Sequence, residues 1–171
     1  MSLAHTHRSI LDTVSAYEKL LGSVSEEAFA ATPRIGGWSY AEVYAHIFNS
    51  NMTCLQAIDK CIQGKAIESG DSMSFPVKLV FFFGRFPPGK FKVPDRLKDQ
   101  VKKISKAEAH ELICQFKDEL SQITPKVNSA NPDQKLKHPR LGLLNAVKWY
   151  EFIEIHTRHH RKQLIRISKV Q

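Results

Sequence analysis

The hydrophobic positions of this chain recur at steps of three and four residues, the spacing that places side chains on one face of an α-helix. Ile10, Val14, Tyr17 and Leu21 form one such stripe near the amino end. Comparable stripes follow in three later segments, and a short helical turn is expected between Ser25 and Pro33. The pattern predicts four amphipathic helices over 8–21, 39–61, 105–127 and 144–169.

Helix-capping residues mark where three of these helices begin. Ser39 and Glu42 have the S-x-x-E spacing of a capping box, and Ser105 and Glu108 repeat it. In such a box, each side chain accepts a hydrogen bond from a free backbone N–H of the other residue. Asn145 can cap the last helix in the simpler way, with its side-chain oxygen alone.

The segment between the second and third helices is the least regular part of the chain. Glycines and prolines interrupt 64–94, so a long regular element cannot cross its second half. Six of the ten phenylalanines nevertheless lie within 75–91. Leaving so much apolar surface in water would be costly. We therefore expect a short helical piece and a loop folded over one end of the bundle, with a subunit contact as the alternative.

The remaining segments carry little sign of regular structure. We expect 128–142 to be a polar loop, and His5 and His7 to lie in an exposed amino-terminal tail. No clear alternation of apolar and polar residues indicates a strand. The chain is therefore predicted to be all-α, a four-helix bundle forming a single domain over 1–171.

Composition and charge narrow the function classes. The longest apolar run, 79–83, is far too short to span a bilayer, and no secretion signal is evident at the amino end. The three cysteines lack CxxC spacing, and Cys54 and Cys61 lie two helical turns apart, too far for a disulfide. Reduced, buried thiols fit a cytoplasmic protein. The net charge of +8 is attributed to solvated helix faces, so neither nucleic acid nor a membrane is expected as a partner.

Two histidines lie on the apolar stripe of the last helix. His156 and His160 are four residues apart and project about 40° from each other, whereas the basic side chains of this helix fall on the opposite side. Such a pair suits zinc or nickel, although buried histidines can instead hydrogen-bond to carbonyls or water. His159 lies at the edge of the stripe and is the least suited to point inward.

His46 supplies a third ligand if the second helix packs beside the fourth; otherwise it is a boundary histidine partly in water. Three protein ligands leave a coordination position open, as in catalytic zinc sites. Glu151 and Glu154 are expected on the outer face of the last helix, which leaves this helix no obvious carboxylate base.

Several motifs together resemble the DinB/YfiT-like superfamily of metal-dependent enzymes. They are Gly-Trp-Ser at 37–39, then His46, the stretch HPRLG at 138–142, Trp149, and the run HTRHHRKQL at 156–164. The phenylalanine-rich insert is similar to that of one uncharacterised branch. The resemblance implies an up-down-down-up four-helix bundle, often a homodimer, with a divalent metal held by three histidines.

Carried onto this sequence, the resemblance identifies the metal ligands as His46, His156 and His160. It also suggests a hydrolase or a transferase that uses a low-molecular-weight thiol, acting on a small-molecule substrate. A non-catalytic binding or stress-response module that retains the bundle is the alternative.

Other polar and aromatic residues near this site are candidates for substrate contacts. Trp149 and Phe152 are expected to wall a pocket, and His138 to reach its mouth. Asn49, Ser50 and Gln163 are candidates for orienting the substrate. Core packing or helix capping is the competing interpretation for each of them.

Overall fold

The described part of the chain is mostly helical. The computed structural model describes residues 2–34, 36–66, 73–87 and 101–169. Its helices are α1 (Leu3–Ser23), α2 (Glu26–Ala30), α3 (Tyr40–Ile62), α4 (Phe75–Phe83), α6 (Lys106–Ile123) and α7 (Ala146–Ile167). A 3₁₀ helix, η1 (Thr124–Ser129), and two short strands, β1 (Lys135–His138) and β2 (Gly142–Asn145), lie between α6 and α7.

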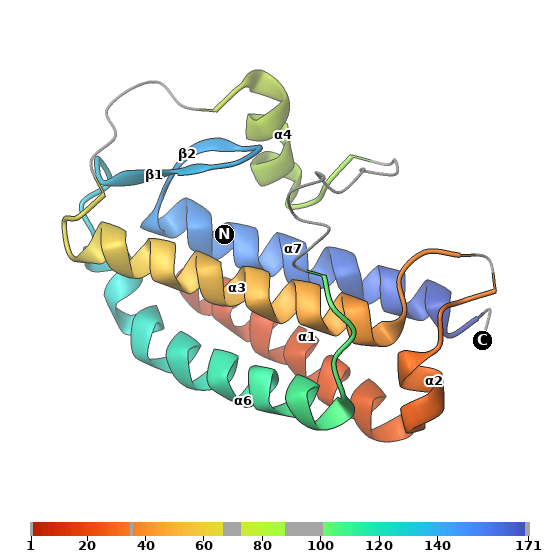
Figure 1. Cartoon of the computed structure of the whole chain (residues 1–171). Coiled ribbons are helices and arrows are strands. Elements are labelled where there is room, and N and C mark those ends of the chain that lie inside the picture. Colours follow the sequence, from red (N-terminus) through yellow and green to blue (C-terminus); the bar gives the residue numbers. More distant parts are fainter. Residues whose placement is uncertain (1, 35, 67–72, 88–100, 170–171) are drawn as a thin grey trace.

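Four long helices form an up-down-down-up bundle, as predicted. In Figure 1, α1 and α7 run in one direction, and α3 and α6 run in the other. Helix α3 packs against α6 and α7, and α1 packs against the same two helices. Thus α3 and α7, which carry the candidate metal ligands, are direct neighbours.

The bundle core is built around aromatic side chains from three helices. The rings of Tyr17 and Tyr44 meet edge to face at 5.3 Å between centroids, and Phe48 meets Phe116 at 5.9 Å. The buried hydroxyls are also satisfied: Tyr44 donates to the carbonyl of Tyr17 (2.8 Å), and Tyr17 donates to that of Thr157 (2.9 Å). These bonds tie α1 to α3 and α7, and they leave neither tyrosine hydroxyl unpaired.

The predicted caps are confirmed. Ser39 with Glu42, and Ser105 with Glu108, both form complete capping boxes. The side chain of Asn145 accepts a hydrogen bond from the backbone N–H of Lys148 at 3.0 Å.

The amino-terminal tail prediction was wrong. Helix α1 begins at Leu3, where Ser2 acts as its N-cap. His5 is exposed, but His7 is half-buried and its Nδ1 lies 2.8 Å from the hydroxyl of Tyr150 on α7. Helix α1 therefore starts before the range 8–21 that its apolar stripe predicts, and the contact of His7 with α7 stabilises this additional turn.

The prediction of a polar loop without strands over 128–142 was also wrong. Strands β1 and β2 pair antiparallel, with Leu136 opposite Leu144. Each strand has four residues, too few for an alternating pattern to stand out in the sequence. Before the hairpin, the chain passes from α6 into the 3₁₀ helix, in which Pro125 lies in the first turn.

The short helix expected in the phenylalanine-rich insert is confirmed as α4. Gly84 ends it in the left-handed conformation (φ 58°), and its carbonyl accepts a hydrogen bond from Arg158. Arg158 lies in the middle of α7, so this segment packs along the side of the bundle and not over one end. Phe91, the last phenylalanine of the insert, lies outside the described residues.

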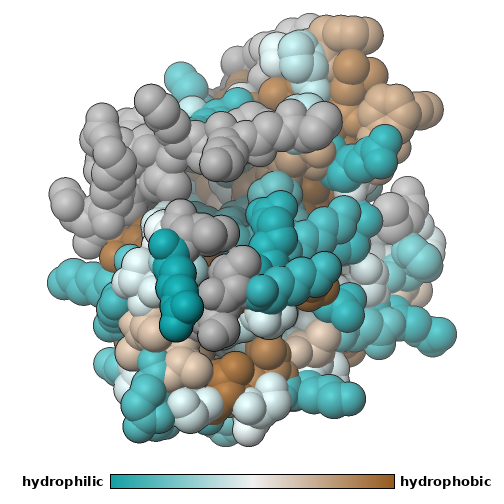
Figure 2. Space-filling view, turned by 90° about the vertical axis from the view of Figure 1, so that its right-hand side faces the viewer, coloured by the Kyte–Doolittle hydropathy of each residue, from teal (hydrophilic) through white to brown (hydrophobic). Residues whose placement is uncertain are grey.

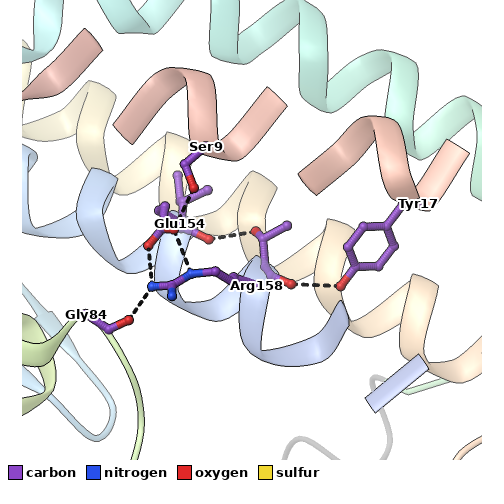
Figure 3. Close-up of polar contacts among 7 residues, drawn as sticks. Ser9, Tyr17, Gly84, Glu154 and Arg158 are labelled. Atoms are coloured by element: carbon purple, nitrogen blue, oxygen red, sulfur yellow. Dashed lines mark hydrogen bonds and ion pairs between the residues drawn. The ribbon is translucent and has the colours of Figure 1, made fainter. Parts of the chain in front are cut away.

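The outward orientation expected for Glu154 was wrong. Glu154 is 4% exposed and faces α1, where its Oε1 accepts a hydrogen bond from Ser9 (2.8 Å). Arg158 binds both carboxylate oxygens, through Nε at 2.8 Å and Nη2 at 3.2 Å, and also reaches Gly84 (Figure 3). Because α7 packs against both α1 and α3, its buried arc is wider than one apolar stripe.

Removing the carboxylate of Glu154 is expected to destabilise the fold. Glu154→Ala leaves Arg158 and Ser9 without their partner, and we expect a cost of about 2 kcal/mol, because Arg158 is itself partly solvated. Thermal unfolding should shift down by roughly 4–8 °C. Glu151→Ala is the matched control, since Glu151 pairs with Lys148 near the surface and such pairs contribute about 0–1 kcal/mol. Equal melting temperatures for both variants would contradict this role of Glu154.

The cysteine prediction holds for two of the three thiols. Cys54 and Cys61 are buried and free, whereas Cys114 is exposed on α6. Burial raises the pKa of the Cys61 thiol to about 11, so this group stays protonated at neutral pH. None of the described helices has the length and hydrophobicity that a bilayer span requires.

Candidate metal centre

Three histidine rings from α3 and α7 meet at one point inside the bundle. The ring centroids are 5.2 Å apart for His46 and His156, 4.8 Å for His46 and His160, and 4.7 Å for His156 and His160. One ring nitrogen of each lies within 4.8 Å of the others. A tetrahedral zinc site brings its nitrogens to about 3.4 Å of one another. Small side-chain rotations therefore suffice to close the triad around an ion.

The three rings are shielded from water and held neutral. His156 and His160 are 8% and 9% exposed, and His46 is half-buried. Burial lowers the pKa of His46 to about 4 and that of His160 to about 3, where the nearby His46 adds to the effect. The pKa of His156 falls well below its usual value, first through burial and then through the other histidines. Neutral imidazoles are the form that binds metal.

The orientation of the His160 ring is fixed from its outer side. Its Nδ1 lies 2.8 Å from Oε1 of Gln163, an oxygen that only accepts hydrogen bonds. Nδ1 therefore carries the proton, and Nε2 keeps its lone pair free. Metal-binding histidines are commonly oriented by such a second partner.

His156 has a buried ring nitrogen, Nδ1, that lacks a hydrogen-bond partner among the described residues. A buried polar atom without a partner costs about 1–3 kcal/mol. The three imidazoles can coordinate a divalent ion, and the ion or a water bound to it can serve as the missing partner. The residues therefore fit a bound metal.

Aromatic rings enclose the triad on two sides. Trp38 packs against His46 (5.0 Å) and stacks on His160 (6.4 Å, 12° between planes). Phe152 stacks on His156 at 5.1 Å with 14° between planes. These contacts limit rotation of the imidazoles and keep bulk water away from them.

A buried polar pair between α3 and α7, Asn51 and Thr157, was missed in the sequence. Asn51 is fully buried, and its Nδ2 donates to Oγ1 of Thr157 at 2.9 Å, which ties α3 to α7 directly after His156. Its Oδ1 has no partner among the described residues. The available signal was a polar residue on the stripe of α3, between Ile47 and Cys54 at helical spacing.

The expected substrate residues differ in burial and contacts, and their roles stay predictions. Trp149 is buried and its ring lies 5.2 Å from that of His138, which also meets Phe152 at 4.7 Å. Ser50 is half-buried on α3, and Asn49 is exposed there. Gln163 contacts His160 as described above. All five remain candidates for substrate contacts.

His138 has a structural role of its own in the hairpin turn. Its Nδ1 accepts hydrogen bonds from the backbone N–H groups of Arg140 and Leu141, both at 3.1 Å. Burial, with the positive charge of Arg140, lowers its pKa to about 4. The ring is thus neutral, and its proton sits on Nε2.

Two further groups lie near the triad but are engaged elsewhere. His159 is half-buried and packs against Phe86 at 5.1 Å between ring centroids, consistent with its predicted place at the edge of the stripe. The carboxylate of Glu42, one turn before His46, is bound in the α3 capping box.

Truncating Gln163 is expected to weaken metal binding without unfolding the protein. Gln163→Ala removes the acceptor that orients His160, and losing such a partner typically costs about 10–100-fold in metal affinity. Titration with zinc in the presence of a competing chelator measures this change. An unchanged affinity would mean that Gln163 does not orient the ligand and would leave only its predicted substrate role.

Comparisons with known proteins agree on family and fold. A family model described as the DinB superfamily matches residues 10–164. A search of curated proteins finds no match. Among solved structures, the crystal structure of TT2238, a four-helix bundle protein, aligns with a TM-score of 0.63 at 16% identity, over 96% of this chain and 99% of that one. At this identity, the likeness concerns the fold alone.

Proposed function

The chain belongs to the DinB superfamily, whose model covers nearly all of it, and on this premise we propose that it binds one divalent metal ion through His46, His156 and His160. Zinc or nickel suits three neutral imidazoles best. We further propose that the site serves a hydrolase or a thiol-dependent transferase acting on a small molecule in the cytoplasm.

The convergence of three neutral imidazoles is the observation that carries the proposal. They come from two helices, have ligand atoms within 4.8 Å of one another, and include a buried nitrogen that has no hydrogen-bond partner in the described part of the chain. Clustering two buried histidines and a half-buried one without a ligand would cost solvation free energy with little compensation.

The residues around the triad define how the site would work. When bound, a divalent ion supplies Lewis acidity that lowers the pKa of a water or thiol ligand toward neutrality. Gln163 holds the His160 proton on Nδ1, and Trp38 and Phe152 hold the rings in place and exclude water. Three protein ligands leave a position for the small molecule.

Two carboxylates that could serve as bases are committed elsewhere. Glu154 is ion-paired on the α1 side of α7, and Glu42 is bound in a cap. The proposed chemistry therefore relies on a nucleophile activated by the metal, either water in a hydrolase or a low-molecular-weight thiol in a transferase.

Metal analysis joined to an activity screen tests the proposal. Freshly purified protein should contain about one zinc or nickel ion per chain, and the loaded protein should turn over an ester, an amide, or an electrophile supplied with a thiol. Metal without turnover would favour a non-catalytic binding or stress-response module. Protein that neither contains nor takes up metal would refute the proposal.

A further inference from the structure

Helix α4 presents a continuous apolar face to the surroundings. Phe75, Leu79, Phe82 and Phe83 are 73%, 38%, 81% and 58% exposed. Their spacing of four, three and one places them on one side of the helix. Figure 2 shows hydrophobic side chains gathered at the top of the molecule, where Figure 1 places α4.

The opposite side of the same helix is already used. Val77 and Val80 are 9% and 7% exposed, and α4 packs against α7. A helix with apolar side chains on opposite faces normally buries both faces. Exposed apolar surface of this density marks a site of interaction. The outer face of α4 therefore offers apolar surface that the bundle does not cover.

The outer face of α4 is too small to hold a second protein copy alone. A helix of nine residues is about 13 Å long and, with side chains, about 10 Å wide. Stable protein interfaces bury about 800 Å² on each partner, several times the footprint of such a helix.

The two charged side chains within 73–87 are both basic, which favours an anionic partner. Lys78 lies within α4, and Arg85 follows it with its guanidinium carbon 5.9 Å from the centre of the Phe83 ring. The chain carries a net charge of +8, so two copies repel each other, whereas an anionic bilayer attracts the protein. Aromatic and aliphatic side chains bordered by cations are typical of helices that lie in a membrane interface.

We propose that the outer face of α4 docks this protein on the surface of an anionic membrane. The rings of Phe75, Phe82 and Phe83 enter the boundary between headgroups and acyl chains, and Lys78 and Arg85 engage lipid phosphates. The contact is peripheral and requires no spanning helix. The proposal differs from the expectation that no membrane is a partner. That expectation rested on the lack of a membrane-spanning segment and on assigning the net charge to solvated helix faces.

Co-sedimentation with lipid vesicles tests this docking surface in the full-length protein. Wild-type protein should bind vesicles of phosphatidylcholine with 30% phosphatidylserine at low salt, and binding should fall as sodium chloride screens the charges. The double variant F75S/F82S should bind more than about tenfold less. The matched control L11S/I165S removes two exposed apolar side chains from α1 and α7 and should bind as the wild type does.

Reversing the charge of the two basic residues separates the electrostatic contribution to vesicle binding from the contribution of the apolar side chains. K78E/R85E should lose binding to anionic vesicles by more than about tenfold, because each basic residue near the surface contributes about 1 kcal/mol. Circular dichroism and melting temperature must match the wild type for each variant. Failure of the wild type to bind anionic vesicles, or equal binding by F75S/F82S, would overturn the proposal. A dimer that light scattering detects and F75S/F82S abolishes, without vesicle binding, would assign the face to a second copy.

Discussion

Replacing His160 with alanine is expected to weaken zinc binding by more than about 100-fold while the helical content stays unchanged. Loss of a residue that merely orients a ligand costs about 10–100-fold, so loss of the ligand itself costs more. The bundle should persist, because its core is held by aromatic packing that does not involve His160. Competitive zinc titration and far-ultraviolet circular dichroism measure the two effects together.

The same loss is expected for His46→Ala and His156→Ala, since all three rings contribute to one site. His159→Ala is the matched control: it removes a half-buried imidazole adjacent to His160 that packs against Phe86 and lies outside the triad. It should retain zinc. If the three triad variants bind zinc as tightly as the wild type, the ligand assignment is wrong.

Metal-free protein is expected to lose several kcal/mol of stability between pH 7.5 and pH 5. The pKa of His46 is lowered to about 4 and that of His160 to about 3, and burial lowers the pKa of His156 well below its usual value, against about 6.5 in an unfolded chain. Below pH 6.5 the unfolded chain therefore binds protons that the folded protein does not. The free energy of unfolding is therefore highest above pH 6.5. Below it, each of the three histidines lowers the free energy of unfolding by about 1.4 kcal/mol per pH unit.

Urea unfolding of the metal-free protein at pH 7.5, 6 and 5 measures this loss. His46→Asn should reduce the dependence on pH, whereas His110→Asn, which changes an exposed histidine on α6, should leave it intact. Zinc should oppose the loss near neutral pH, since a ligand at 100 times its Kd adds about 2.7 kcal/mol. The same free energy of unfolding at pH 7.5 and pH 5 would contradict the buried, neutral state of the triad.

The helical framework could be predicted because its signals are local. Apolar stripes and capping boxes act within one helix, and Ser39, Ser105 and Asn145 begin the expected helices. Elements that depend on contacts elsewhere were missed. The first turns of α1 contact α7 through His7, and the hairpin has strands of only four residues.

The convergence of the three histidines could be predicted only in part. The spacing of His156 and His160 on the core stripe is a local signal, whereas the approach of His46 depends on α3 packing beside α7. Trp38 reaches His46, and Asn51 reaches Thr157, through tertiary contacts that no spacing reveals. The inward turn of Glu154 was missed because a single stripe does not describe a helix that packs against two neighbours.

Anomalous diffraction at the zinc absorption edge, from crystals grown with zinc, tests the central claim most directly. We expect a single strong peak per chain, about 2.0–2.1 Å from one nitrogen each of His46, His156 and His160. The position opposite these ligands should hold water or a small molecule. A peak bound by other residues, or density between the three rings that shows no anomalous signal under zinc saturation, would contradict the account.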